Sequence, residues 1–227
     1  MTISQSHRGF VFGSYRGLHD SEMEELIQGF LAPVQKTEGV LRGRMQARQL
    51  ELQGTGSVVI KPYFRGGLLR HVNKRTYLGI GKPRSMAEFE MLEHVRSLGV
   101  YAPEPVAYAV KGRIFYHAWL ITAQIQDAVS LSELSLNNSA AAKKAVSSVA
   151  RQVGILVSGG IYHVDLHPGN VLVNERGTAW FIDFDRAKTG VQNRQKLFKR
   201  YVKRWKRAAD KYGLPGFVRE ALRQIEF

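Results

Sequence analysis

The sequence predicts an α+β fold of two lobes, an antiparallel-sheet N-lobe and a small, mostly helical C-lobe, in a single domain of residues 1–227. Runs of β-branched and aromatic residues between glycine turns indicate strands at about 34–61 and 106–121. Apolar residues recur at helical spacing in 85–98 and 139–158. Because no repeat or low-complexity linker interrupts the chain, we expect an N-lobe of about 1–125 and a C-lobe of about 126–227.

Composition and charge narrow the classes of function. The 227 residues include 33 lysines and arginines against 19 aspartates and glutamates, a formal net charge of +14. A field of this sign attracts nucleic acid, an anionic membrane surface or a phosphorylated substrate. The absence of cysteine excludes disulfides and thiolate metal sites. Charged residues interrupt the first thirty positions, so we expect no signal peptide, no membrane span and a cytoplasmic location.

One segment carries the clearest chemical signature. Residues 163–170 read His-Val-Asp-Leu-His-Pro-Gly-Asn, and Ile-Asp-Phe-Asp follows at 182–185. These fit the H-x-D-L-x-x-x-N loop and the D-F-x turn that kinase-fold phosphotransferases place under the nucleotide phosphates. Phosphoryl transfer requires a carboxylate that orients the attacking hydroxyl and accepts its proton, which we assign to Asp165. The oxygens of Asn170 and Asp183 are the expected Mg²⁺ ligands.

The spacer between these two motifs has the length of a hairpin. Residues 171–173 and 178–182 are strand-like, and a glycine-containing turn at 174–177 joins them. A hairpin here returns Asp183 to the neighbourhood of Asn170. The alternative is a polar loop capped by a helix-end aspartate, but the two motifs together favour a protein-kinase-like fold that uses ATP and Mg²⁺.

A lysine at the end of a strand supplies a second part of this pattern. Val-Val-Ile-Lys at 58–61 matches the strand whose lysine holds the α- and β-phosphates and pairs with a helix glutamate. The following helix offers Glu88, Glu90 and Glu93. We predict Glu88 as the partner of Lys61, with Glu93 as second choice. The alternative for Lys61 is a solvated strand end.

Two glycines precede this strand. Gly39 and Gly43 would allow a hairpin backbone to lie close over phosphates, where side chains would block it. The spacing is not the complete G-x-G-x-x-G pattern, and any hairpin favours glycine. The two readings, nucleotide contact and simple turn, therefore remain open for Gly39 and Gly43.

The two ends of the chain carry amphipathic helices. Ser21 and Glu24 have the spacing of a capping box that opens a short helix. Residues 186–211 are strongly basic with interleaved apolar positions. Such a helix is typical of a membrane surface or a nucleic-acid contact, and the alternative is a terminal helix packed on the C-lobe. We favour packing, with a weak attraction to anionic lipid.

The sequence resembles the lipopolysaccharide core kinases of Gram-negative bacteria, which include 3-deoxy-D-manno-octulosonic acid (Kdo) kinase and heptose kinase. The resemblance covers roughly residues 33–190. Its motifs are Lys-Pro-Tyr-Phe-Arg-Gly-Gly-Leu at 61–68, Glu-Phe at 88–89 with Leu92, Pro-x-Pro-x-Ala at 103–107, and the two motifs at 163–170 and 182–185. The Arg-Gly-Gly segment and the small second lobe resemble the Kdo kinase branch more than the heptose kinases.

This resemblance implies transfer of the ATP γ-phosphate to a sugar hydroxyl of Kdo-lipid A at the cytoplasmic face of the inner membrane. Lys61 would hold phosphates, Glu88 would orient it, and Asp165 would be the base. Asn170 and Asp183 would bind Mg²⁺. A lipid-linked sugar and an anionic membrane surface are the expected partners, and no DNA is expected.

The sequence also departs from the protein-kinase pattern. Val164 replaces the catalytic-loop arginine, Asp185 replaces the glycine of the metal turn, and no Ala-Pro-Glu segment follows. His167 stands in the place of the catalytic-loop lysine, where it would contact the γ-phosphate or only pack. Two other functions remain open: a heptose, small-molecule or protein kinase of this fold, and a non-catalytic pseudokinase that binds RNA or an acidic partner.

Overall fold

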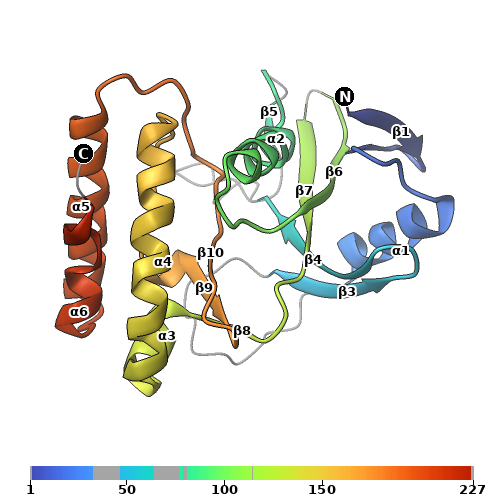
Figure 1. Ribbon diagram of the computed structural model, residues 1–227. Helices are drawn as coiled ribbons and strands as arrows, with labels where there is room; N and C mark the ends of the chain where they lie inside the picture. The colour runs from blue at the N-terminus through green and yellow to red at the C-terminus, as the bar shows by residue number, and fades with distance from the viewer. Residues whose placement is uncertain (1, 33–46, 64–76, 79–80, 114, 226–227) are drawn as a thin grey trace. The chain divides into compact units, whose positions relative to one another are not determined.

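The computed structural model describes residues 2–32, 47–63, 77–78, 81–113 and 115–225. The chain divides into two compact units (Figure 1). The first comprises Met1–Glu90 and Glu104–Gln124, and the second comprises Met91–Pro103 and Ile125–Phe227. The predicted lobes are continuous in sequence, whereas the unit containing the C-terminus also takes in Met91–Pro103.

The first unit is built on an antiparallel sheet. Within the described residues its strands follow the order β1-β2-β6-β7-β4-β3, and β5 pairs with β7. The strands are β1 (Ile3–His7), β2 (Phe10–Ser14), β3 (Arg48–Leu52), β4 (Gly56–Pro62), β5 (Tyr77–Leu78), β6 (Pro105–Lys111) and β7 (Phe115–Ala123). The predicted strand near 34–37, with Gly39 and Gly43, lies outside the described residues. The strands predicted at about 106–121 are β6 and β7, which pair in antiparallel fashion.

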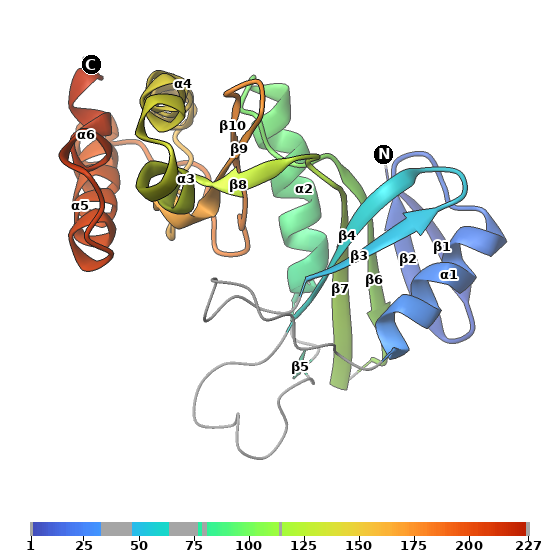
Figure 2. The same ribbon diagram turned by 90° about the horizontal axis from the view of Figure 1, so that it is seen from below.

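Helix α1 (Asp20–Leu31) covers one face of this sheet (Figure 2). Met23, Leu26 and Ile27 pack into a core that also holds Phe10 and Phe12. Burial of these side chains is the main stabilising contribution in this unit. Phe10 and Phe12 lie in β2, which forms a hairpin with β1.

The predicted capping box of α1 is wrong by two residues. The helix begins after His19, whose backbone N–H donates to Glu22 Oε2 at 3.0 Å. Glu24 is engaged elsewhere, because its carboxylate bonds Arg8 Nη1 at 2.7 Å. The predicted cap residue therefore lies inside the helix, and Glu22, a buried glutamate two residues before Glu24, performs the capping.

Helix α2 (Arg84–Ser97) begins in the first unit and ends in the second. It differs by one residue at each end from the predicted range 85–98. Phe89, Leu92 and Val95 form its buried stripe, as the helical spacing predicts. Glu88 is adjacent to this stripe and is itself buried, with only 2% of its surface exposed.

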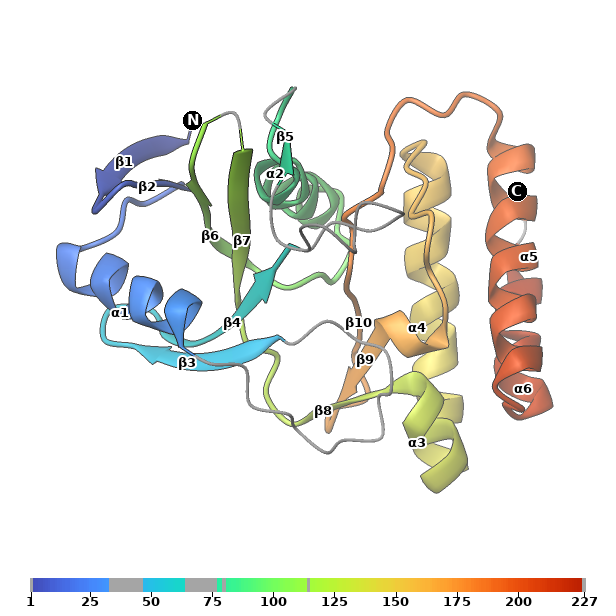
Figure 3. The ribbon, with the colours of Figure 1, turned by 180° about the vertical axis from the view of Figure 1, so that it is seen from behind.

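The second unit is mostly helical (Figure 3). Its described elements are β8 (Ala128–Ser130), α3 (Leu131–Asn137), α4 (Ser139–Ser158), the 3-10 turn η2 (Pro168–Asn170), β9 (Val171–Asn174), β10 (Ala179–Phe181), α5 (Arg194–Lys211), α6 (Gly216–Arg219) and the 3-10 turn η3 (Ala221–Gln224). The strands form an antiparallel sheet in the order β10-β9-β8. Helix α4 has the predicted bounds, because Asn138 caps its start and Gly159 ends it.

Together the two units confirm the predicted fold class, an α+β, kinase-like fold with an antiparallel-sheet unit and a mostly helical one. Among the residues that the structure describes, no helix has the length and apolar character required to cross a bilayer.

Candidate active site

Strand β4 carries Lys61 of the first unit. Val58 and Ile60 point into the core, and because side chains alternate along a strand, Lys61 projects from the opposite face. Its Nζ lies 2.7 Å from Glu88 Oε2 and 3.0 Å from Glu88 Oε1. The structure thus brings together the two residues that the sequence analysis paired.

The alternative partners are directed elsewhere. Glu90, two residues later on α2, forms an ion pair with Lys82. Glu93 is exposed. Because successive helical positions are rotated by about 100°, only one of the three glutamates faces β4. That residue is Glu88.

Tyr63 is a third member of this cluster. It belongs to the motif at 61–68, but its role could not be predicted from the sequence. Its ring is buried, and its hydroxyl donates a hydrogen bond to Glu88 Oε2. Lys61 Nζ lies 5.3 Å from the ring centroid, and the Arg84 guanidinium lies 5.7 Å from it. The Glu88 carboxylate is therefore held by a cation and a hydroxyl, with two cations against the aromatic ring.

The loop of residues 163–170 carries the candidate groups of the second unit. The His163 backbone N–H donates to Tyr201 Oη at 2.7 Å, and the Tyr201 hydroxyl donates to Ile161 O at 2.9 Å. Burial raises the pKa of Tyr201 above its usual value, so this hydroxyl stays protonated. The His163 ring packs on Phe184 with centroids 4.4 Å apart, and its Nε2 lies 3.0 Å from Ile182 O. These contacts hold the start of the loop in place.

The two motifs of the second unit meet through the predicted hairpin. Strands β9 and β10 are antiparallel, with Val171 opposite Phe181. The Ile182 N–H donates to Asn170 O at 3.1 Å, so Asp183 follows immediately after a residue bonded to Asn170. Asn170 is buried, and its Nδ2 donates to Asp165 O at 3.0 Å. Hydrogen bonds of Asn170 thereby link Asp165 to Ile182, the residue before Asp183.

Asp183 has an unusual backbone conformation. Its φ of 69° lies in the left-handed region, which non-glycine residues rarely occupy. A strained residue of this kind persists only where the surrounding structure determines it, and such residues cluster at functional sites. The left-handed turn re-aims the chain directly after β10, at the residue that the sequence predicts as a metal ligand.

Asp165 has a partner that the sequence analysis missed. Its side chain is 47% exposed, and Arg204 Nε donates to its Oδ1 at 3.0 Å while Arg204 Nη2 bonds the same oxygen. Arg204 is one of many basic residues in α5, 39 positions further along the chain. No local signal distinguishes it from its neighbours, because only the packing of α5 brings it to the loop.

His167 caps the short turn η2. The Gly169 N–H donates to His167 Nδ1 at 3.1 Å. A nitrogen that accepts is not protonated, so in the neutral ring the proton is on Nε2. The ring lies 6.4 Å from that of Tyr212, centroid to centroid. His167 therefore has a structural role in the loop and an Nε2–H donor.

The predicted residues thus fall into two groups, one in each unit. Lys61 and Glu88 form the first, and Asp165, His167, Asn170 and Asp183 form the second. Gly39 and Gly43 lie outside the described residues. Within the described residues, no three histidines, aspartates or glutamates cluster in a way that would hold a metal by themselves.

Comparison with known proteins agrees with these features. The chain is 32% identical over 133 residues to the 3-deoxy-D-manno-octulosonic acid kinase of Vibrio vulnificus strain CMCP6, a match that covers 57% of this chain and 56% of that protein. It is 30% identical over 154 residues to the protein of that name from Vibrio cholerae, covering 66% and 65%. To the one from Haemophilus influenzae it is 28% identical over 221 residues, covering 90% and 91%.

Similarity to the Vibrio vulnificus protein thus spans little more than half of that relative's length. The family model described as lipopolysaccharide kinase (Kdo/WaaP) matches residues 34–220, which is most of the chain and includes every candidate residue named above. Because this match covers well over half of the chain, the chain belongs to the lipopolysaccharide kinase (Kdo/WaaP) family.

Proposed function

We propose that this protein is an ATP- and Mg²⁺-dependent phosphotransferase that phosphorylates a sugar hydroxyl of the lipopolysaccharide inner core, with Kdo as the acceptor sugar. The observation that carries the proposal is in the second unit, where Asn170 is hydrogen-bonded both to Asp165 O and to the Ile182 N–H, and Asp183 follows Ile182. Family membership supports the reaction class. The names of the relatives support the choice of Kdo.

The residues of the first unit are suited to binding a nucleoside triphosphate. Lys61 is 19% exposed, and its ammonium is oriented by the buried Glu88 carboxylate. A lysine held in this way presents a fixed positive charge to phosphate oxygens. Tyr63 donates to the same carboxylate and so fixes its orientation. Lys61 would bind the α- and β-phosphates, and Glu88 and Tyr63 would position Lys61.

The donor set of the second unit fits a magnesium ion bound together with phosphates. Mg²⁺ prefers oxygen ligands and is often held by one or two protein groups, with phosphates and water completing the shell. Asn170 and Asp183 would provide an amide oxygen and a carboxylate. When bound, Mg²⁺–ATP supplies the phosphoryl group and neutralises the charge that develops on its oxygens.

Asp165 is the group suited to the acceptor. Its half-exposed carboxylate would orient the sugar hydroxyl and receive its proton as the oxygen attacks the terminal phosphorus. Arg204 bonds only Oδ1 among the described contacts and would act as a positioning residue for this carboxylate. The Nε2–H of His167, on the same loop, is a donor suited to a phosphate or acceptor oxygen.

The proposal is tested by measuring Mg²⁺-dependent transfer of labelled γ-phosphate to purified Kdo-lipid A precursor. The Asp165→Ala variant is the control, and a protein mixture is the competing acceptor. We expect label on the glycolipid, lost in the variant and lost when Mg²⁺ is chelated.

Each other outcome contradicts a different part of the proposal. Label found only on an acceptor that carries heptose would show that heptose and not Kdo is the acceptor sugar, while the proposed reaction would stand. Label on the protein mixture would show that the substrate is a protein and not a sugar. Label on no acceptor, with nucleotide affinity retained, would reject the kinase activity in favour of a binding protein of the same fold.

A further inference from the structure

Helix α5 has two faces of opposite character. Its buried residues are apolar or aromatic: Leu197, Tyr201, Trp205, Ala208 and Ala209. Trp205 also donates through Nε1 to Val218 O at 2.7 Å, which joins α5 to α6. Figures 1 and 2 show α5 at the margin of the second unit, with α4 on its inner side. The face that packs against the protein and the charged face are therefore on different sides of one helix.

The other face forms a continuous row of cations, which we call the α5 stripe: Lys196, Lys199, Arg200, Lys203, Arg207 and Lys211. All six are exposed, and they recur at intervals of one, three or four residues. Such intervals keep the side chains on one side of a helix with 3.6 residues per turn. The stripe runs about 22 Å along the helix at a rise of about 1.5 Å per residue.

The cations that flank the stripe on α5 form ion pairs with acidic residues. Arg204 pairs with Asp165 on one side, and Lys206 lies 3.4 Å from Glu220 on the other. Asp210, the acid of α5, is bonded to Arg219 at 2.7 Å. Within the described part of the chain, Lys196, Lys199, Lys203 and Arg207 form no ion pair. Uncompensated like charges at these intervals destabilise a helix, so the packed face must offset this repulsion.

Helix α5 is also bonded to the loop of residues 163–170. The contacts are the Tyr201 hydroxyl to the His163 backbone, Arg204 to Asp165, and the Tyr212 ring beside the His167 ring at the end of the helix. Tyr212 is exposed, and Lys211 Nζ lies 5.3 Å from its ring centroid. Whatever the stripe binds is consequently held at a fixed distance from Asp165.

We propose that the α5 stripe docks on the phosphate headgroups of an anionic phospholipid surface and thereby holds the Asp165 loop at that surface. Charge complementarity carries the docking, because six exposed cations face outward from one helix. The choice of lipid over nucleic acid rests on the proposed function, since the acceptor of that reaction is lipid-linked. The exposed Tyr212 ring suits the headgroup region, where tyrosine is enriched.

The mode of binding follows from the burial of the other face. Interfacial helices usually insert their apolar side among the acyl chains. Here Leu197, Tyr201 and Trp205 are buried in the protein. The stripe therefore binds by electrostatic attraction without insertion, so binding requires anionic lipid and is reversed by salt, which shortens the Debye length to roughly 3 Å at about 1 M.

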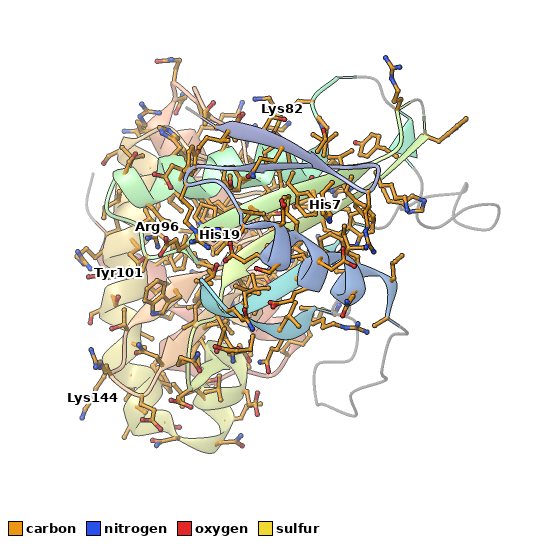
Figure 4. All side chains as sticks on the ribbon, turned by 90° about the vertical axis from the view of Figure 1, so that its right-hand side faces the viewer. His7, His19, Lys82, Arg96, Tyr101 and Lys144 are labelled. Carbon is orange, nitrogen blue, oxygen red and sulfur yellow. The ribbon has the colours of Figure 1, made fainter. Side chains whose placement is uncertain are left out.

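The test is co-sedimentation of the full chain with phosphatidylcholine vesicles that contain or lack phosphatidylglycerol. The test variant is Lys199→Gln/Lys203→Gln/Arg207→Gln, which removes three charges and keeps helix-compatible side chains. The matched control, Lys143→Gln/Lys144→Gln/Arg151→Gln, removes three exposed charges from α4 of the same unit. Lys144 extends outward from that helix (Figure 4). Circular dichroism and thermal unfolding establish that both variants are folded.

We expect the unaltered protein to bind only the vesicles with phosphatidylglycerol and to be released by salt. Each basic residue near an anionic surface contributes roughly five-fold to the partition coefficient, so the α5 variant should bind roughly a hundred-fold more weakly. The α4 variant should bind as the unaltered protein does. Equal losses in the two variants would show that only net charge matters and would overturn the assignment to α5.

Two further results would overturn the proposal. One is absence of binding to either vesicle by the folded, unaltered protein. The other is salt-sensitive binding to an RNA duplex, abolished by the α5 changes, without vesicle binding. Sedimentation requires no nucleotide turnover, so failure of the proposed reaction would leave this result intact. Conversely, the α5 variant should phosphorylate a water-soluble Kdo acceptor at the normal rate, which separates docking from chemistry.

Discussion

The two carboxylates of the candidate site, Glu88 and Asp165, differ in how the fold holds them. Glu88 is 2% exposed and bonded by both Lys61 and Tyr63. Asp165 is 47% exposed and bonded at one oxygen by Arg204, which is itself 33% exposed. A buried carboxylate must be fully paired, because an uncompensated charge in the interior is costly. A half-exposed pair is screened by water and exchanges partners at little cost.

This difference corresponds to the two tasks that we assign. Lys61 must stay in one place to hold phosphates, and a buried, doubly bonded carboxylate is suited to that purpose. Asp165 must accept a new hydroxyl at each turnover, so a carboxylate with a weakly held partner is the appropriate arrangement. Altering the buried pair should therefore lower the stability markedly, whereas altering the exposed pair should lower the rate of transfer with little effect on stability.

The largest effect is expected on turnover from the exposed carboxylate. Asp165→Ala should lower the rate of phosphate transfer by about 10³-fold, the usual contribution of a general base, while nucleotide affinity is retained. Single-turnover transfer and nucleotide titration measure the two quantities separately. Glu175→Ala, an exposed carboxylate in the β9–β10 turn, is the control and should retain full activity. An unchanged rate in Asp165→Ala would remove the base assignment.

The buried pair should show the largest effect on stability. Lys61→Ala leaves Glu88 without its cation and should lower the free energy of unfolding by about 3 kcal/mol, measured by denaturant unfolding. The double variant Lys61→Met/Glu88→Gln should recover most of that stability but not phosphate transfer. Recovery of transfer in the double variant would show that the pair is only structural.

Tyr63→Phe should have an intermediate effect. The substitution keeps the ring and removes one donor to a buried carboxylate, which should cost about 1.5 kcal/mol of unfolding free energy. Because Lys61 then has a less constrained partner, KM for ATP should rise more than kcat falls. Tyr101→Phe, at an exposed ring, is the matched control. Equal KM values in Tyr63→Phe and the unaltered protein would remove Tyr63 from the positioning role.

The smallest effect on stability is expected at Arg204. Arg204→Gln should change the free energy of unfolding by less than about 1 kcal/mol, because its ion pair is exposed. Its kcat should nevertheless fall roughly ten-fold through loss of carboxylate orientation, with KM for ATP unchanged. Arg204→Lys should restore only part of kcat, since an ammonium cannot reproduce the Nε and Nη2 contacts. A stability loss as large as that of Lys61→Ala would break the contrast between the two pairs.

Much of the fold could be predicted because local patterns report local structure. The bounds of α4, the β9–β10 hairpin and the pairing of β6 with β7 all follow from apolar periodicity and turn residues. The choice of Glu88 followed from its position beside a buried helical stripe. The capping of α1 was misplaced because two glutamates of similar spacing were available. Only their partners, Thr55 with Arg16 for Glu22 and Arg8 for Glu24, decide between them.

The sequence by itself thus determined the fold class, the loop that carries Asp165 and the lysine–glutamate pairing. The first two follow from residues close together in the chain or from a regular period, and the third follows from the match of residues 58–61 to a kinase strand whose lysine pairs with a helix glutamate. Tertiary structure alone decided that Tyr63 bonds Glu88, that Arg204 bonds Asp165, and which cations of α5 form ion pairs with other described residues. The physical reason is that these partners lie far apart along the chain and no motif pairs them. A contact between side chains 25 or 39 positions apart depends on how whole elements pack, and no local pattern of residues encodes that packing.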